Sequence, residues 1–412
     1  MLKAGKKLTI FSWAMYDFAN TIFAMNVITL YFALWVTVDM KGEDILYSFA
    51  LSGSMLITAL TAPVIGAISD RAGKRVPFLI VFTIICCIFT ALIGVANKLF
   101  IGLILFAIAN YCYQMGYVFY NALLPVVSDK KHIGRVSGYG TGLGYFGTIA
   151  GLLLVSPFAL HFGRQATFIP TAICFLLFAL PCFIFVKDVK TVKLGKLGEQ
   201  SALQAVTSAF IKIKNTILHI KQYPGLLRFL ITAFIGLNAI NTIYIFMAVY
   251  TKKVLGFGNA EIIILYIVSS IFAIVGSLIA GFYCDRIGAK NTFMAVLGLW
   301  CICVLLAIFS FYKTVFWFVG PLAGMCLAGT WTSARALTVD LSPPEMIAEV
   351  FGFYSLVGRA ASIFGPLIWG ATVLSFGFLG IIKYRLAVSA LFIFLCLSLW
   401  IARKIPNKVH KE

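Results

Sequence analysis

The sequence predicts an all-α polytopic membrane protein with twelve transmembrane helices in two six-helix, pseudo-symmetric halves. Three observations predict this class: an apolar composition, twelve long apolar segments, and a repeat between the two halves of the chain. Of the 412 residues, 61% are hydrophobic and 11% are charged, and the mean hydropathy is +1.00. Soluble domains average about 45–50% apolar and about 25% charged residues. The composition therefore excludes a soluble globular protein.

Twelve apolar segments are bounded by charged residues or by Gly and Pro, and a bilayer core needs about 20 residues for each crossing. They lie near residues 8–38, 45–69, 77–97, 99–127, 137–160, 165–186, 225–251, 260–284, 291–311, 314–340, 350–376 and 380–402. One long polar stretch separates the sixth segment from the seventh. We therefore expect an N-terminal half over 1–186, a cytoplasmic linker over 187–224 and a C-terminal half over 225–412. The linker has the helical spacing of an amphipathic helix on the inner leaflet.

The basic residues predict the orientation of the chain. The net charge is +19, from 33 Lys and Arg against 14 Asp and Glu. With both termini in the cytoplasm, 23 of the 33 basic residues fall in cytoplasmic segments, as the positive-inside rule requires. This distribution explains the charge without nucleic acid as a partner. We expect a multi-pass protein of the cytoplasmic (inner) membrane with both termini cytoplasmic.

A sequence pattern recurs after the second and the eighth apolar segments. The first copy contains Gly66, Asp70, Arg71 and Gly73, and the second repeats the same residues displaced by 215. A second set, Gly138, Gly144 and Gly151, recurs displaced by 214. A parallel duplication of six spans accounts for both offsets, and such repeats are typical of secondary transporters.

The repeated loop, Gly-x-x-x-Asp-Arg-x-Gly-basic-basic, resembles the signature between spans 2 and 3 of the major facilitator superfamily. That resemblance implies a conformational latch made of Gly66, Asp70, Arg71, Gly73 and Arg75 in the first copy and Asp285 and Arg286 in the second. The alternative interpretation is that these charges only set the topology.

Two further segments carry a narrower resemblance. They read Trp-Ala-Met-Tyr-Asp-Phe-Ala-Asn over residues 13–20 and Tyr-Asn-Ala-Leu-Leu-Pro over residues 120–125. Both resemble the branch related to the autophagy-linked vacuolar effluxers, whose fungal members are taken to release amino acids. This resemblance implies a transporter of small polar solutes.

Polar side chains inside the spans indicate a substrate path. A charged side chain costs roughly 2.5–3.5 kcal/mol to place at the centre of a membrane helix, so its presence indicates a function or a partner. They recur at helical spacing on the first and fourth span of each half, the spans that line the central cavity in the superfamily. The candidate substrate-binding residues are Asp17, Asn20, Asn110, Gln114, Tyr117, Asn121, Asn238, Asn241, Trp331 and Arg335.

Two of these candidates are charged, and two roles fit them equally. The guanidinium of Arg335 suits a substrate carboxylate, and Asp17 suits an amine or a coupling proton. Alternatively the two side chains pair with each other as a gate.

The predicted function is secondary active transport of an amino acid or similar zwitterion by alternating access, coupled to protons. The alternatives are efflux of organic anions or amphipathic compounds and, in another class, a non-transporting membrane sensor. We expect a monomer that binds a small-molecule substrate and membrane lipid. The sequence has no G-x-x-x-x-G-K-[ST] phosphate loop and no H-E-x-x-H motif. We expect no catalytic residues, no metal and no cofactor.

Overall fold

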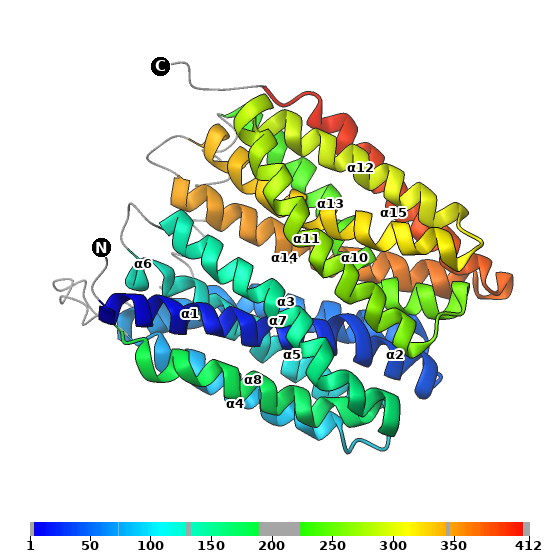
Figure 1. Ribbon diagram of the computed structural model, residues 1–412, viewed down its shortest axis with the longest axis horizontal. Helices are drawn as coiled ribbons and strands as arrows, with labels where there is room; N and C mark the ends of the chain where they lie inside the picture. Colours follow the sequence, from blue (N-terminus) through cyan, green and yellow to red (C-terminus); the bar gives the residue numbers. More distant parts are fainter. Residues whose placement is uncertain (1–3, 73, 129–132, 189–222, 343–346, 407–412) are drawn as a thin grey trace. The chain divides into compact units, whose positions relative to one another are not determined.

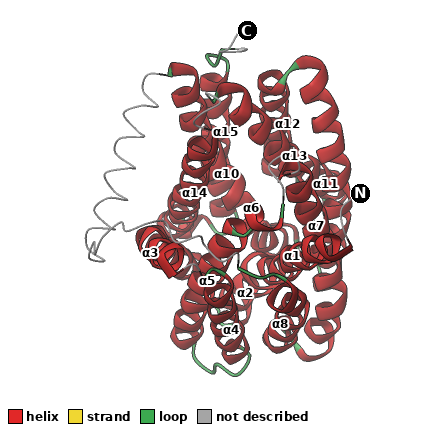
Figure 2. Ribbon diagram, turned by 90° about the vertical axis from the view of Figure 1, so that its left-hand side faces the viewer, coloured by secondary structure: helices red, strands yellow, loops and turns green. Residues whose placement is uncertain are grey.

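The computed structural model describes residues 4–72, 74–128, 133–188, 223–342 and 347–406. Every regular element within these ranges is a helix, and none is a strand (Figure 2). Twelve helices in the described ranges are long and apolar enough to cross a membrane. Each of them coincides with one of the twelve predicted spans. The predicted linker, with its amphipathic stretch, falls almost entirely on residues 189–222, outside the described residues.

The chain forms two compact units, which are Met1–Lys41 with Gly53–Ile213 and Gly42–Ser52 with Lys214–Glu412. In Figure 1 the helices of the first unit run from blue to green. They are α1 (Ala4–Phe23), α2 (Phe32–Leu34), α3 (Asp44–Ala72) from Gly53 onward, α4 (Val76–Ile93), α5 (Leu99–Ala122), α6 (Leu124–Val127), α7 (Ile133–Phe162) and α8 (Phe168–Phe185). The second unit contains the start of α3, α10 (Pro224–Leu255), α11 (Asn259–Ile287), α12 (Ala289–Phe309), α13 (Lys313–Leu341), α14 (Ile347–Ser375) and α15 (Ile382–Ala402).

The sequence repeat is visible in the helix boundaries. Helix α11 begins and ends 215 residues after α3, and α13 and α14 begin 214 residues after α5 and α7. The packing repeats as well. In the first unit α1 packs on α7 and α8, and α4 packs on α5 and α8; in the second unit α10 packs on α14 and α15, and α12 packs on α13 and α15. The same pattern of apolar faces therefore assembles the same way twice.

The first span departs from regular α-helix in its C-terminal half. After α1 the chain is π-helical over Ala24–Tyr31 and again over Trp35–Asp39. The wider π winding is uncommon and is found often at functional sites. Here it is deeply enclosed, because every residue over 25–36 is buried. The span that contains it is the most buried of the twelve, and α10 is the next.

Glycines of α7 let it approach α1 closely. A Cβ atom on Gly147 would lie 2.2 Å from the Phe18 carbonyl oxygen and 2.6 Å from Thr21 Oγ1. Thr21 also donates a hydrogen bond to the Gly144 carbonyl at 2.7 Å. No other residue type fits this spacing, since real Cβ atoms do not come this close to backbone atoms. The glycine-rich fifth span therefore serves helix packing.

Much of the outer surface of the spans is apolar. Phe100 is 68% exposed, Phe318 is 73% exposed and Leu278 is 71% exposed. In water such a surface would be unfavourable over several long helices, because exposed apolar patches on soluble proteins are small. In a bilayer these side chains contact lipid tails.

Candidate functional site

Asp17 and Asn20 lie on one face of α1, as their spacing predicts. Asn20 is 2% exposed, and its side-chain amide donates a hydrogen bond to the Tyr113 hydroxyl of α5 at 3.2 Å. The Asn20 Oδ1 atom has no hydrogen-bond partner among the described residues. Asp17 is half-buried, and its Oδ2 atom would lie 3.4 Å from a Cβ atom on Gly144. The first unit thus holds a carboxylate and a buried amide oxygen on adjacent turns.

An aromatic cluster lies beside Asp17. The Trp13 and Tyr120 rings stack with centroids 4.5 Å apart and planes 11° apart, and Tyr16 and Tyr117 stack on Tyr120 at 5.1 and 5.8 Å. The Trp13 indole donates to the Tyr120 carbonyl at 3.1 Å. The Tyr120 hydroxyl is buried with no hydrogen-bond partner among the described residues, and the charge of Asp17 acts on it. Stacked rings and an unused hydroxyl therefore accompany the carboxylate.

The polar stripe on α5 divides between two environments. Asn110 is fully buried and donates to Ser54 Oγ of α3 at 2.7 Å, so it ties these two helices together. Gln114 and Tyr117 are half-buried. Asn121 is exposed and donates to the Tyr117 carbonyl at 2.9 Å. The stripe therefore does not present one continuous polar surface.

In the second unit the two asparagines of α10 contact their own helix and α14. Asn238 is 1% exposed and donates to the Phe234 carbonyl at 2.7 Å, and its Oδ1 atom has no partner in the described ranges. Asn241 donates to Ser362 Oγ at 3.0 Å. The Asn241 bond joins the polar face of α10 to α14.

Arg335 lies half-buried on α13, one turn after Trp331. Its Nε atom donates to the Trp331 carbonyl at 3.3 Å, which is the one hydrogen bond it makes within the described part of the chain. The Tyr354 hydroxyl of α14 lies within electrostatic range and is itself buried without a described partner. Neither Nη atom of Arg335 has a hydrogen-bond partner in the described ranges, and a planar carboxylate is what a guanidinium fork binds best.

The first copy of the repeated loop is described only in part. Gly66, Asp70 and Arg71 lie in α3, but the side chains of Asp70 and Arg71, like all of Gly73, lie outside the described residues. Arg75 is described, and its Nη1 atom donates to the Ala122 carbonyl at the end of α5 at 2.8 Å. This contact joins the loop to the C-terminal end of the fourth span.

The second copy of the loop is described in full. Asp285 and Arg286 are exposed at the end of α11, where the Arg286 guanidinium lies over the Phe282 ring, 4.7 Å from its centroid. The turn that follows needs Gly288, whose φ of +87° is reached easily by glycine alone. Of the described residues, no group of three or more His, Cys, Asp or Glu side chains could hold a metal ion.

A family model described as "Vacuole effluxer Atg22 like" matches residues 44–408. The chain belongs to this family. The predicted resemblance of the chain to the autophagy-linked vacuolar effluxer branch is therefore confirmed. The Trp13 and Tyr120 segments, 107 residues apart, stack on each other in this Atg22-like chain.

Individual relatives agree with the family. The uncharacterized MFS-type transporter YxiO of Bacillus subtilis (strain 168) is 26% identical over 421 residues, which cover 97% of this chain and 95% of that protein. Autophagy-related protein 22 of Eremothecium gossypii is 23% identical over 431 residues, covering 88% of this chain and 84% of that protein. A crystal structure of a mutant of the nucleoside transporter NupG superposes with a TM-score of 0.77 at 14% identity, covering 96% of this chain and 99% of that chain. At that identity the structure shows the fold alone.

The Atg22-like chain is therefore an integral, multi-pass membrane transporter of the major facilitator type. The prediction of twelve helices in two six-helix halves is confirmed.

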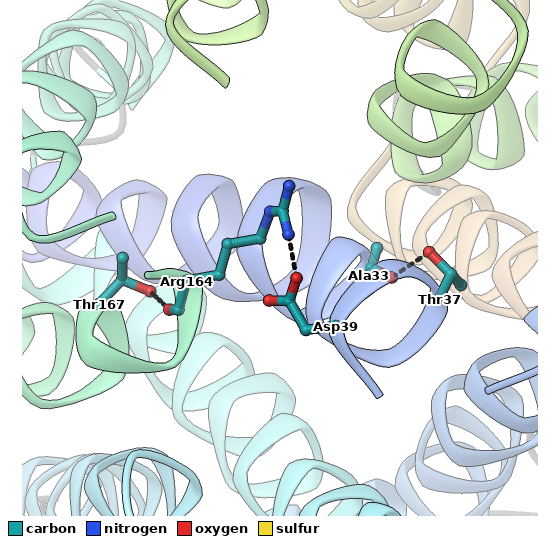
Figure 3. Close-up of polar contacts among 5 residues, drawn as sticks. All are labelled: Ala33, Thr37, Asp39, Arg164 and Thr167. Atoms are coloured by element: carbon teal, nitrogen blue, oxygen red, sulfur yellow. Dashed lines mark hydrogen bonds and ion pairs between the residues drawn. The ribbon is translucent and has the colours of Figure 1, made fainter. Parts of the chain in front are cut away.

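The sequence did not predict two contacts that position the helices of the first unit. Asp39, at the end of the first span, forms an ion pair with Arg164, which begins the 3-10 turn before α8 (Figure 3). Asp188 accepts hydrogen bonds from the backbone N–H groups of Arg75 and Val76, at 2.8 and 3.2 Å, and so caps the start of α4. Sequence gives no signal for either, because the partners are more than 100 residues apart.

Proposed function

We propose that the protein is a secondary active transporter of an amino acid or a similar zwitterion, working by alternating access. The observation that carries the proposal is the Arg335 guanidinium, half-buried in a membrane span with both Nη atoms uncommitted among the described residues. A charged group in this position is costly unless it serves a ligand or a partner. Arg335 would bind the substrate carboxylate, with the Trp331 ring next to it on α13.

The first unit supplies the complementary chemistry for the amine. Asp17 offers a carboxylate, Asn20 offers an amide oxygen without a described partner, and Tyr120 offers a buried hydroxyl. An ammonium group donates three hydrogen bonds and needs acceptors of this kind. Gln114, Tyr117 and Asn241 are polar residues of the same or equivalent helices and would contact the rest of the solute.

We also propose an orientation in the membrane, a coupling ion and an oligomeric state. Both termini lie in the cytoplasm and the protein resides in the cytoplasmic membrane, because 23 of the 33 basic residues then fall inside. A proton couples transport, with Asp17 as its site when the substrate leaves. The working unit is a monomer, and the halves over 1–186 and 225–412 move about the substrate.

Thermal stabilisation of the purified protein tests the substrate class. Amino acids, organic anions and amphiphiles are screened in turn, and a ligand at 100 times its dissociation constant stabilises by about 2.7 kcal/mol. We expect an amino acid to raise the melting temperature of the wild type and of Arg403→Ala, an exposed arginine at the end of α15, but not of Arg335→Ala. Stabilisation by amphiphiles alone, or an equal response of Arg335→Ala, would overturn the zwitterion assignment.

A further inference from the structure

Asp44 is the one acidic side chain among the described residues that is buried, at 3% exposure. It begins α3. Its Oδ1 atom accepts a hydrogen bond from the Trp369 indole of α14 at 3.5 Å, and its Oδ2 atom accepts one from the Tyr384 hydroxyl of α15 at 3.2 Å. All of these residues belong to the second unit.

Two lysines lie near Asp44 without pairing with it. The Nζ atoms of Lys253 on α10 and Lys383 on α15 lie over the Tyr384 ring, 5.7 and 5.3 Å from its centroid. Both act on Asp44 electrostatically, but within the described ranges neither forms an ion pair with it. Trp369 on α14 carries no titratable group. The Asp44 carboxyl group is buried, and the side-chain hydrogen bonds that it accepts among the described residues come from two neutral donors.

Asp44 belongs to a short segment that docks on the second unit. We call residues 44–52 the α3 head. Besides the bonds of Asp44, Ser52 Oγ donates to the Ile363 carbonyl of α14 at 2.8 Å, and the Tyr47 ring packs edge-on against Phe246 of α10 at 5.5 Å. As residue numbers rise from 44 to 52 along α3, the partners on α14 fall from 369 to 363, so the two helices run antiparallel.

Gly370 makes this docking possible. A Cβ atom there would lie 2.7 Å from both Ser48 Oγ and Ile45 Cδ1, and 2.9 Å from Ile45 Cα.

The remainder of α3, from Gly53 onward, belongs to the first unit. A single continuous helix therefore has its head held by one unit and its body by the other. In the proposed alternating-access cycle the units move, and the docking of the head is a contact that can open and close as they do.

We propose that Asp44 is a proton-binding site that controls whether the α3 head stays docked on α14 and α15, an inference that rests on the proposed transport function. With its proton bound, the carboxyl group is neutral, keeps its contacts to Trp369 and Tyr384, and the head is docked. When the O–H bond breaks, the proton passes to water, and the carboxylate that remains needs hydration. The head then parts from α14. Asp44 is a second proton site, separate from Asp17.

Accessibility of residue 48 tests the proposal without any substrate. The probe is a membrane-impermeant maleimide added to the full chain carrying Ser48→Cys, reconstituted in vesicles. The readout is mass spectrometry of the peptide with residue 48, so the native cysteines stay in place. Rates are divided by those of Glu43→Cys, an exposed position just before the head, which removes the intrinsic pH dependence of the thiol. We expect the ratio to rise at least fivefold between pH 5.5 and 8.

Two substitutions in the Ser48→Cys chain assign the effect to Asp44. Asp44→Asn mimics the protonated acid, so the ratio should be low at both pH values. Glu43→Gln removes the neighbouring exposed acid and should leave the fivefold rise unchanged. A ratio independent of pH with Asp44 present, or a rise retained in Asp44→Asn, would overturn the proposal.

A steric wedge gives a test that does not depend on Asp44→Asn folding. Gly370→Ala should give a high ratio at both pH values, because its new methyl group occupies the space of Ser48 and Ile45. Gly53→Ala, on the same helix as the head with no atom within 4 Å of its new Cβ, should behave like the parent. A wedge variant that stays protected and responsive to pH would show that the head does not dock as proposed. Since no substrate is used, failure of the amino-acid assignment leaves this result intact.

Discussion

Trp13 and Tyr120 stack with ring centroids 4.5 Å apart, and the Trp13 indole donates a hydrogen bond to the Tyr120 backbone carbonyl. The contact joins α1 to α5 next to Asp17. Trp13 is 2% exposed and Tyr120 is also 2% exposed. Stability and the shape of the candidate site therefore depend on the same pair of rings.

Trp13→Ala should destabilise the protein by about 3–5 kcal/mol, because it removes a fully packed aromatic side chain. Trp13→Phe keeps a ring for stacking and loses the indole bond, so its cost should be about 1 kcal/mol. The measurement is the melting temperature in detergent. The control is Trp400→Ala, whose ring is 54% exposed on α15 and should cost little. Equal losses for Trp13→Ala and Trp400→Ala would contradict the stacked contact.

Gly147→Ala should destabilise the packing of α7 on α1 by about 1–3 kcal/mol, the usual cost of forcing extra volume into a packed interface. Its Cβ would meet the backbone of Phe18, which cannot turn away as a side chain can. Gly142→Ala is the matched control on the same helix, because no atom lies within 4 Å of its Cβ. That variant should melt at or slightly above the wild-type temperature, since alanine favours helix. If both variants melt alike, α7 does not approach α1 this closely.

Asp17→Asn should lower transport of the stabilising amino acid at least tenfold and abolish the proton movement that accompanies it. The substitution preserves size and removes the charge that would hold an ammonium group or a proton. Folding should be unchanged, as judged by elution volume and melting temperature. Asp340→Asn, another half-buried acid near the end of α13, should transport normally. Wild-type pH-dependent flux in Asp17→Asn would remove Asp17 from the mechanism.

Asp17 and Asp44 are proposed to bind protons independently, so the two substitutions should affect different measurements. Asp17→Asn should leave the pH dependence of labelling at residue 48 unchanged, because Asp44 stays in place. A single titrating group for both events would make the two variants behave alike, and parallel measurements on both would reveal it.

Sequence periodicity predicted which helix face each candidate residue occupies, but it did not predict what that face contacts. Asn110 and Gln114 are one turn apart on α5, yet Asn110 bonds Ser54 in a dry interface and Gln114 is half-buried. A polar residue that faces a neighbouring helix and one that faces a solute path have the same spacing. The difference depends on which helix packs on that face, and Ser54, the partner of Asn110 on α3, is 56 residues away in the chain.

The sequence by itself determined the twelve spans, the duplication of six and the family. These features are local: a bilayer offers no hydrogen bonds, so an apolar run of sufficient length must satisfy its own backbone as a helix. Only the tertiary structure decided that Trp13 meets Tyr120 and that Asp44 is buried against Trp369 and Tyr384. It also assigned the first residues of α3 to the second unit. Hydropathy cannot select such partners, because close packing and hydrogen-bond geometry between distant helices choose among faces that are equally apolar in sequence.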